Sequence, residues 1–96
     1  MHYRCALITG ATSGIGKAMA EAMPVETDLL LTGRDGERLA ALADALATDG
    51  RRVEILVADL ATAEGRAGVI ARAEAMEIDF LINNAGLGRF GSVAET

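Results

Sequence analysis

Several residue types are scarce in this chain of 96 residues, and each scarcity narrows what the protein can be. A single cysteine, Cys5, cannot form an internal disulfide, and its place in an apolar stretch indicates a buried, inert thiol. No basic-then-apolar signal segment opens the chain, and no apolar run is long enough to span a membrane. We therefore expect a protein of the reducing cytoplasm, with no membrane partner.

Positive charge is also scarce. Nine Lys and Arg residues face 14 Asp and Glu residues, which gives a formal net charge of −5. No basic stripe is available to neutralise phosphates along a polymer or an anionic lipid surface. The sequence therefore predicts no nucleic-acid partner.

Apolar residues, in contrast, are abundant. They make up 51% of the chain although aromatic residues make up only 3%, a composition that suits a parallel sheet covered on both faces. The length is that of one domain, near the small end of what buries an adequate core. We expect residues 1–96 to belong to one domain, because no linker, repeat or low-complexity run interrupts them.

The hydrophobic pattern alternates between short apolar runs and helical periodicity. Strands are expected at residues 4–9, 28–32, 52–58 and 78–82, and the helices between them begin near Gly14, Asp35 and Thr62. Pro24 stops the first helix just after Met23, and Gly50 closes the second.

Each expected helix has an apolar stripe. The stripes are Ile15, Met19 and Met23; then Leu39, Leu42, Ala43 and Leu46; then Val69, Ile70, Ala73 and Met76. Asp35 and Thr62 are placed to cap the second and third helices. Gly65 and Gly68 should make the first turns of the third helix the least stable helical stretch.

Strands that alternate with crossover helices predict an α/β fold with a parallel sheet and helices on both faces. Ligands of such sheets bind outside the carboxyl ends of the strands, at the point where the strand order reverses. The residues that follow each expected strand are therefore the first candidates for a site.

A glycine-rich turn follows the first expected strand. Gly10, Gly14 and Gly16 have the spacing G-x-x-x-G-x-G and lead directly into the first helix. Glycines let a backbone approach a pyrophosphate closely, and a helix N-terminus offers free N–H groups and a positive dipole. Small residues also gather at any tight strand-to-helix turn, so the glycines alone leave a purely structural role open.

A second motif follows the last expected strand, where the apolar residues 78–82 run into Asn83-Asn84-Ala85-Gly86. The two motifs, in this order and at this separation, resemble those of the classical short-chain dehydrogenase/reductase family. The resemblance implies a Rossmann-type doubly wound sheet of four strands in the order 3-2-1-4 with three helices, so that both motifs lie at one crevice. Members of the family are longer, so the chain resembles an incomplete, N-terminal portion.

The resemblance also implies a set of cofactor-binding residues. Thr12 and Ser13 would lie nearest the pyrophosphate or the adenosine ribose, and Asn84 would lie toward the nicotinamide half. The full set is Gly10, Thr12, Ser13, Gly14, Ile15, Gly16, Arg34, Asp59, Leu60, Asn84, Ala85 and Gly86, with no metal ligand among them.

The residues after the second strand bear on the choice of cofactor. Dinucleotide folds that prefer NAD(H) place an acidic residue here to bind the ribose hydroxyls, but this chain has Gly33 followed by Arg34. A guanidinium suits a 2′-phosphate, so NADP(H) is expected over NAD(H). Arg34 could instead be a solvated cation that pairs with Asp35 or Glu37.

Two further positions carry alternatives. Asp59 resembles a family residue that accepts a hydrogen bond from the adenine amine, beside the apolar edge of Leu60, although it could simply form the turn before the third helix. Asn83 and Asn84 could likewise bridge strand ends through their amides, and such a role is compatible with cofactor binding.

The family's catalytic tyrosine, with a lysine four residues later, has no counterpart here. The only tyrosine, Tyr3, is followed four residues later by Leu7, and Lys17 is best interpreted as a solvated cation. No catalytic residue is therefore assigned within this chain.

We expect the N-terminal NADP(H)-binding portion of an enzyme that transfers hydride between a nicotinamide cofactor and a small carbonyl or alcohol substrate. The alternative is a non-catalytic dinucleotide-binding or interaction module that is complete in itself. A different Rossmann protein, for a nucleotide sugar or a methyl donor, would explain the glycine turn but not Asn83-Asn84-Ala85-Gly86. The last strand would be an open sheet edge, so we expect a homo-oligomer or self-association through that edge.

Overall fold

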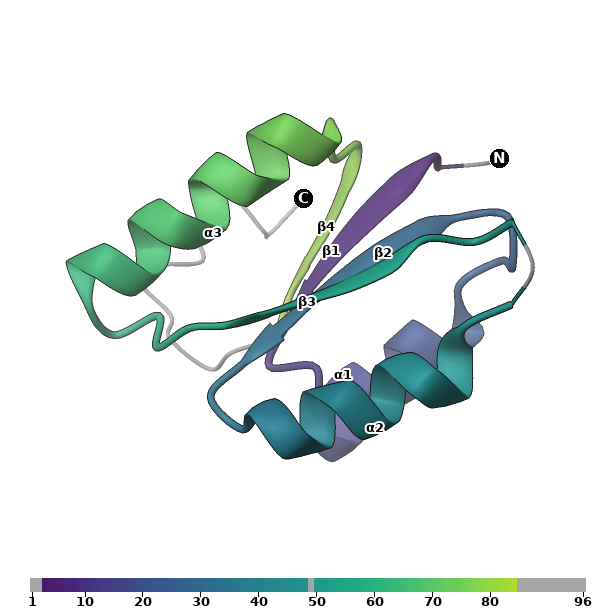
Figure 1. Ribbon diagram of the computed structural model, residues 1–96, viewed down its shortest axis with the longest axis horizontal. Helices are drawn as coiled ribbons and strands as arrows, with labels where there is room; N and C mark the ends of the chain where they lie inside the picture. Colours follow the sequence, from purple (N-terminus) through teal and green to yellow (C-terminus); the bar gives the residue numbers. More distant parts are fainter. Residues whose placement is uncertain (1–2, 49, 85–96) are drawn as a thin grey trace.

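The computed structural model describes residues 3–48 and 50–84. The described elements are β1 (Cys5–Thr9), α1 (Gly14–Ala22), β2 (Asp28–Gly33), α2 (Gly36–Leu46), β3 (Val53–Val57), α3 (Ala63–Met76) and β4 (Phe80–Asn83). Within these residues the strands form one parallel sheet in the order β3-β2-β1-β4, as Figure 1 shows. The predicted doubly wound α/β fold and its strand order are confirmed.

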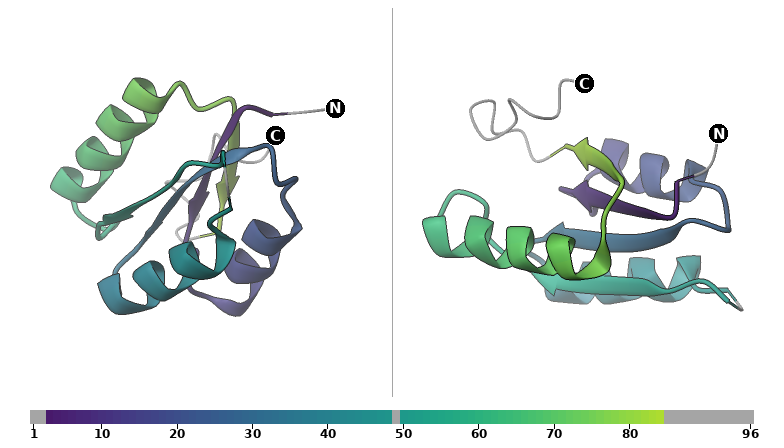
Figure 2. Two further views of the ribbon diagram at one scale, coloured as in Figure 1. Left: turned by 45° about the vertical axis from the view of Figure 1, so that its right-hand side comes forward. Right: turned by 90° about the horizontal axis from the view of Figure 1, so that it is seen from above.

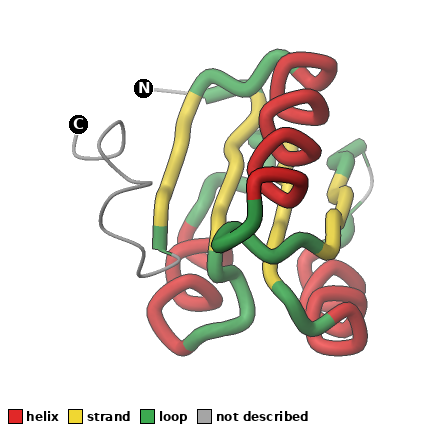
Figure 3. Tube along the Cα trace, turned by 90° about the vertical axis from the view of Figure 1, so that its left-hand side faces the viewer, coloured by secondary structure: helices red, strands yellow, loops and turns green. Residues whose placement is uncertain are grey.

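β1 is one of the two inner strands and hydrogen-bonds to β2 on one side and to β4 on the other. Leu7 lies opposite Leu30 of β2 and Leu81 of β4. All four strands run in one direction, so their carboxyl ends meet at one edge of the sheet, from which the loops after β1, β2 and β3 emerge (Figure 3).

The sheet has a hydrophobic core on each face, because successive side chains of a strand point to opposite sides. Helices α1 and α2 cover one face and α3 covers the other (Figure 2). The core under α1 and α2 contains Ala6, Ile8, Leu29, Leu31, Leu39, Leu42 and Leu46. The core under α3 contains Cys5, Leu7, Leu30, Leu60, Val69 and Met76.

The predicted apolar stripe of α1 is confirmed at Met23, which packs against the core, but it is wrong at Ile15 and Met19. Ile15 is 65% exposed and Met19 is 42% exposed, whereas the buried residues of this helix are Gly16 and Ala20. A Cβ atom at position 16 would lie 2.8 Å from Asn84 Nδ2 and would collide with Gly10 O. The helix therefore approaches the strand ends so closely that only small residues fit between them.

Helix α2 follows its predicted stripe, since Leu39, Leu42 and Leu46 are buried. Its end was predicted wrongly: the helix stops at Leu46 rather than at Gly50. Gly50 instead has a φ of 84° and belongs to the turn that leads to β3. A positive φ costs glycine little, which explains its place in that turn.

Helix α3 begins as predicted at Thr62, whose Oγ1 accepts a 2.9 Å hydrogen bond from Gly65 N. Val69 and Met76 are buried, but Ile70 is 53% exposed, contrary to its place in the predicted stripe. Consecutive helical residues differ by about 100° around the axis, so the helix buries Val69 and turns Ile70 outward.

The last strand begins later than predicted. Glu77 ends α3 in the left-handed region, with a φ of 57°, and the N–H of Ile78 donates to Ala73 O. Ile78 therefore still bonds to the helix, whereas the N–H of Asp79 already donates to Cys5 O at the start of β1, and β4 itself runs over Phe80–Asn83. Its residues are half-buried rather than fully buried, because in the described sheet β4 has a neighbour on one side only.

None of the helices in residues 3–48 and 50–84 combines the length and the apolar character that crossing a membrane requires.

Candidate functional site

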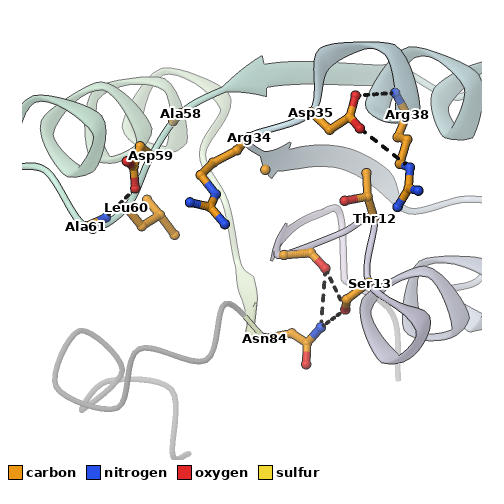
Figure 4. Close-up of a pocket in the computed structure, with 12 residues that line it drawn as sticks. Thr12, Ser13, Arg34, Asp35, Arg38, Ala58, Asp59, Leu60, Ala61 and Asn84 are labelled. Carbon is orange, nitrogen blue, oxygen red and sulfur yellow. Dashed lines mark hydrogen bonds and ion pairs between the residues drawn. The ribbon is translucent and has the colours of Figure 1, made fainter.

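One cavity of about 400 Å³ opens at the carboxyl edge of the sheet (Figure 4). The loops after β1, β2 and β3 contribute to its wall, together with the residue that follows β4. The lining residues are Gly10, Thr12, Ser13, Gly33, Arg34, Asp35, Arg38, Ala58, Asp59, Leu60, Ala61 and Asn84.

Most of the site residues predicted from the sequence come together in this wall. They are Gly10, Thr12, Ser13, Arg34, Asp59, Leu60 and Asn84. Gly14, Ile15 and Gly16 form the first turn of α1, beside the cavity and not in its wall. Ala85 and Gly86 lie outside the described residues.

The three glycines of the turn serve different purposes. Gly10 has a φ of 60°, and its carbonyl accepts 3.1 Å and 2.9 Å hydrogen bonds from the N–H and Oγ of Ser13. Gly16 faces the end of β4 with no room for a side chain, whereas a Cβ at Gly14 would meet no protein atom within 4 Å. Fold geometry therefore explains Gly10 and Gly16 but leaves Gly14 unexplained.

Ser13 is the N-cap of α1, because its Oγ accepts a 3.2 Å hydrogen bond from Gly16 N. The first N–H groups of a helix have no partner inside the helix and carry its partial positive charge. Helix α1 begins with Gly14 and Ile15 at the carboxyl edge of β1. Their backbone N–H groups would therefore stabilise an anionic group bound there.

The two asparagines connect β4 to β1 and to the glycine turn. Thr9 is fully buried, and its Oγ1 donates to Asn83 Oδ1 over 2.8 Å and accepts from Asn84 N over 2.8 Å. Asn84 Nδ2 donates to Ser13 Oγ over 2.6 Å and to Gly10 O over 3.3 Å. Asn83 and Asn84 therefore bridge the end of β4 to β1 and to the glycine turn, which is the structural role that the sequence left open.

Arg34 is exposed at the end of β2 and points into the cavity (Figure 4). The ion pair with Asp35 or Glu37 that the sequence allowed is not formed. Asp35 instead lies 3.5 Å from the Nε of Arg38, and no carboxylate of residues 3–48 and 50–84 lies within ion-pair distance of Arg34.

Gly33, the residue before that arginine, leaves an open position beside Thr12. A Cβ built there would lie 3.8 Å from Thr12 Oγ1 and 3.8 Å from Leu39 Cδ2, which is ordinary contact distance. A Cβ atom therefore fits at position 33, so close packing around the Cα does not require the glycine.

Asp59 forms the turn before α3, as one of its two sequence interpretations predicts. Its Oδ1 accepts a 2.9 Å hydrogen bond from Ala61 N, and its backbone oxygen accepts from the N–H of Thr62. The other carboxylate oxygen remains an acceptor at an exposed position of the cavity wall. Leu60 beside it is 6% exposed, since most of its side chain packs into the core under α3.

Sequence reasoning missed Asp35 and Arg38 as residues of the site. Arg38 lies in the first turn of α2, outside the glycine turn, the residues directly after β2 and the asparagine motif. The signal was present in the cap, because an N-cap at Asp35 places residue 38 in the first turn, near the end of β2.

Tyr3 and Cys5, two potentially reactive side chains outside the cavity, are packed against other residues. Tyr3 stacks on Phe80, with ring centroids 4.2 Å apart. Cys5 is 3% exposed, and burial raises the pKa of its thiol, which disfavours the nucleophilic thiolate. No cluster of metal-binding side chains occurs in the part of the chain that the structure describes.

Comparison with known proteins decides the family. Residues 4–96 match the short chain dehydrogenase family. The chain belongs to this family. Members of this family use nicotinamide cofactors. The cavity suits such a phosphate-bearing cofactor, because its wall combines a glycine-rich turn, the N-cap of a helix and cationic side chains.

Two curated relatives illustrate the similarity. The oxidoreductase UcpA of Escherichia coli K12 is 38% identical over 91 residues, which are 93% of this chain and 35% of the relative. The 3-oxoacyl-[acyl-carrier-protein] reductase FabG of the same organism is 38% identical over 87 residues, 90% of this chain and 35% of the relative. The chain thus spans about a third of the length of these relatives.

Solved structures agree with the fold. The L-sorbose reductase of Gluconobacter frateurii, in complex with NADPH and L-sorbose, superposes with a TM-score of 0.79 at 37% identity. The match covers 88% of this chain and 34% of that reductase.

Proposed function

We propose that this chain is the N-terminal NADP(H)-binding portion of a short-chain dehydrogenase/reductase. The whole protein would transfer hydride between the nicotinamide cofactor and a small carbonyl or alcohol substrate. Residues 1–96 would form part of a single Rossmann domain, and a cytoplasmic location suits the buried thiol of Cys5.

The proposed cofactor lies across the carboxyl edge of the sheet. Its pyrophosphate would contact the glycine turn and the first N–H groups of α1. Its adenosine would occupy the cavity, with the adenine beside Asp59 and Leu60 and the 2′-phosphate beside Arg34. Asn84, Ala85 and Gly86 would lie toward the nicotinamide half.

The observation that carries this proposal is the pair Gly33 and Arg34 at the end of β2. A Cβ atom would fit at position 33, yet the residue is glycine, so no acidic side chain is present there to bind ribose hydroxyls or to repel a 2′-phosphate. Arg34 lines the cavity, and none of the described carboxylates pairs with it. A guanidinium in that situation can give its full set of donors to a phosphate.

Two structures of relatives support the same choice. The L-sorbose reductase, 37% identical to this chain, is complexed with NADPH. A 3-oxoacyl (acyl-carrier-protein) reductase of Agrobacterium tumefaciens, 34% identical with a TM-score of 0.73, has NADP bound.

When bound, the nicotinamide supplies or accepts the hydride. The described residues of this chain would hold the phosphates and the adenosine, and Asn84 would keep the glycine turn fixed against β4. The chain has no Tyr-x-x-x-Lys motif, so the proton donor of the proposed reaction is not assigned to any of its residues.

Fluorescence titration with NADPH and with NADH tests the proposal. We expect NADPH to bind more tightly, and Arg34→Ala to weaken NADPH binding about tenfold, the effect of losing one charge-assisted contact, while NADH binding changes little. Equal affinity of the unmodified chain for the two cofactors would end the proposal of NADP(H) preference.

A gain-of-function variant sharpens the test. Gly33→Asp adds a carboxylate where the backbone leaves room, so we expect it to fold, to lose NADPH affinity and to gain NADH affinity. The matched control is Gly33→Asn, which has nearly the same size without the charge and should weaken NADPH binding less. If Gly33→Asp and Gly33→Asn have the same effect on both cofactors, the cofactor does not lie beside position 33.

A further inference from the structure

Cations gather around Thr12 although the chain carries a net charge of −5. Arg34 and Arg38 line the carboxyl-edge cavity together with Thr12. Thr12 and Arg38 also line a second cavity of about 340 Å³, which Lys17 borders as well. Thr12 and Arg38 are therefore shared by the walls of both cavities.

The side chain of Arg38 is held in place by Asp35 alone among its described contacts. One carboxylate oxygen of Asp35 accepts a 3.1 Å hydrogen bond from Arg38 N, and the other lies 3.5 Å from Arg38 Nε. The ion pair uses Nε only, and neither Nη atom of Arg38 has a hydrogen bond or ion pair within residues 3–48 and 50–84. Its side chain is 72% exposed, so these Nη donors are accessible to a ligand.

The same contact changes the charge that Asp35 presents to the cavity. Asp35 lies in the cavity wall, where an uncompensated carboxylate would repel a bound phosphate. The guanidinium of Arg38 offsets that charge. Arg38 can therefore favour a phosphate in two ways, by donating to it and by neutralising Asp35.

We propose that Arg38 is a second ligand of the 2′-phosphate and a specificity-determining residue. Thr12, Arg34 and Arg38 line the same cavity, and Figure 4 draws Thr12 between the two arginines, so a phosphate bound in this cavity beside Thr12 would accept from both guanidinium groups. This inference rests on the proposed function, because it assigns a further residue to the same nucleotide site.

The test uses two nucleotides that differ only in the 2′-phosphate, 2′,5′-ADP and 5′-ADP, with binding measured by calorimetry. We expect Arg38→Ala to weaken 2′,5′-ADP binding about fivefold, the effect of one exposed charged contact, and to change 5′-ADP binding less than twofold. The matched control is Arg4→Ala. Arg4 is also 72% exposed and also has one surface ion pair, with Glu77, but it lies outside the cavity.

A second variant separates the phosphate role from the support of α2. Asp35→Asn removes the charge but keeps a good N-cap, so we expect the helix to remain folded. Binding of 2′,5′-ADP should strengthen about threefold, because a repulsive charge is lost and Arg38 is released to the phosphate. Arg38→Lys should retain part of the affinity as a point charge.

Different failures have different meanings. If Arg38→Ala weakens both nucleotides equally, or neither, while Arg34→Ala still abolishes the preference for 2′,5′-ADP, the second ligand is refuted and the proposed function stands. If the unmodified chain binds both nucleotides equally, the NADP(H) proposal and this inference fall together. Urea unfolding of each variant shows whether a lost affinity reflects a lost fold.

Discussion

Asn84 Nδ2 donates a 2.6 Å hydrogen bond to Ser13 Oγ and so joins the end of β4 to the N-cap of α1. The two residues are 71 positions apart in the sequence and belong to the two motifs that identify the family. The hydroxyl that accepts this bond also accepts from Gly16 N and donates to Gly10 O. A single serine therefore fixes the glycine turn, the start of the helix and the neighbouring strand relative to one another.

This relationship predicts an energetic coupling between Ser13 and Asn84. Ser13→Ala removes a helix cap and should cost about 1 kcal/mol of unfolding free energy. Asn84→Ala should cost about 1 kcal/mol through its lost hydrogen bonds. Because the two residues share one bond, the double variant should cost about 0.5–1 kcal/mol less than the sum. Urea denaturation measures all four proteins of the cycle, and strictly additive losses would show that the bond contributes nothing.

The glycines of the turn predict opposite outcomes for two similar substitutions. Gly16→Ala places a methyl group against Gly10 O and Asn84 Nδ2, and we expect it to lower the free energy of unfolding by about 2 kcal/mol. Gly14→Ala meets no protein atom within 4 Å, so folding stability should stay equal or rise.

NADPH titration of the same pair then tests the cofactor role of Gly14. If that glycine permits the close approach of a pyrophosphate, Gly14→Ala will weaken NADPH binding without a loss of stability. A Gly14→Ala variant that binds NADPH like the unmodified chain would show that this glycine has no role in cofactor binding.

Much of this architecture was predictable because it depends on local patterns. The leucines of α2 repeat with helical spacing, and the caps at Asp35 and Thr62 are recognisable from residue type and position. The strand order followed from the resemblance of two motifs. Each of these features can be inferred from nearby residues or from a family pattern.

The features that could not be predicted depend on contacts between distant segments. Ile15 and Met19 look like a buried stripe, but Asn84 occupies the space that a side chain at Gly16 would need, and this sets which face of α1 turns inward. The position of Arg38 in the cavity likewise depends on how Asp35 directs its side chain. Periodicity carries no information about either contact.

Helix α3 offers a second matched pair of glycines. Gly68 has no atom within 4 Å of a built Cβ, so Gly68→Ala should raise the free energy of unfolding by about 0.5–1 kcal/mol through helix propensity. A Cβ at Gly65 would collide with Asp59 O, so Gly65→Ala should be destabilising and should disturb the cavity wall as well. Thermal unfolding of the two variants checks the sign of each effect, and the same sign for both would refute the role assigned to Gly65.

The hydrogen bonds of Asp79 should make the free energy of unfolding depend on pH. Its carboxylate accepts hydrogen bonds from Arg4 N at 2.9 Å and Cys5 N at 3.0 Å, and these bonds lower the pKa of Asp79 in the folded chain. A carboxyl with a depressed folded pKa stabilises the fold above its unfolded pKa, which is about 3.9, and loses that contribution as the pH falls through the folded value. Asp79→Asn should therefore flatten the acid limb of the stability curve below about pH 4 and leave its shape near pH 7 unchanged.

The control for this measurement is Asp44→Asn. Asp44 is an exposed residue of α2, far in sequence from the start of β1, and its replacement should leave the acid limb as it is. Equal flattening in the two variants would mean that net charge, and not the hydrogen bonds of Asp79, sets the acid limb.

The two edges of the described sheet differ in their protection, and this difference predicts self-association. Strand β3 carries Glu54, which pairs with Arg52 at 3.6 Å and with Arg72 at 3.0 Å, and charge on an edge opposes pairing with another chain. Strand β4 has the uncharged sequence Phe80–Asn83 and, within residues 3–48 and 50–84, pairs with β1 only. We therefore expect association that increases with concentration in sedimentation equilibrium and that proceeds through β4.

Two substitutions assign the edge. Leu81→Lys puts a charge on β4 and should shift the chain toward monomer, whereas Glu54→Leu removes the charge from β3 and should open a second route of association. Circular dichroism of each variant confirms that the sheet is retained before the masses are compared. A chain that stays monomeric over the whole concentration range, or a Leu81→Lys variant that associates as strongly as the unmodified chain, would show that β4 is not the associating edge.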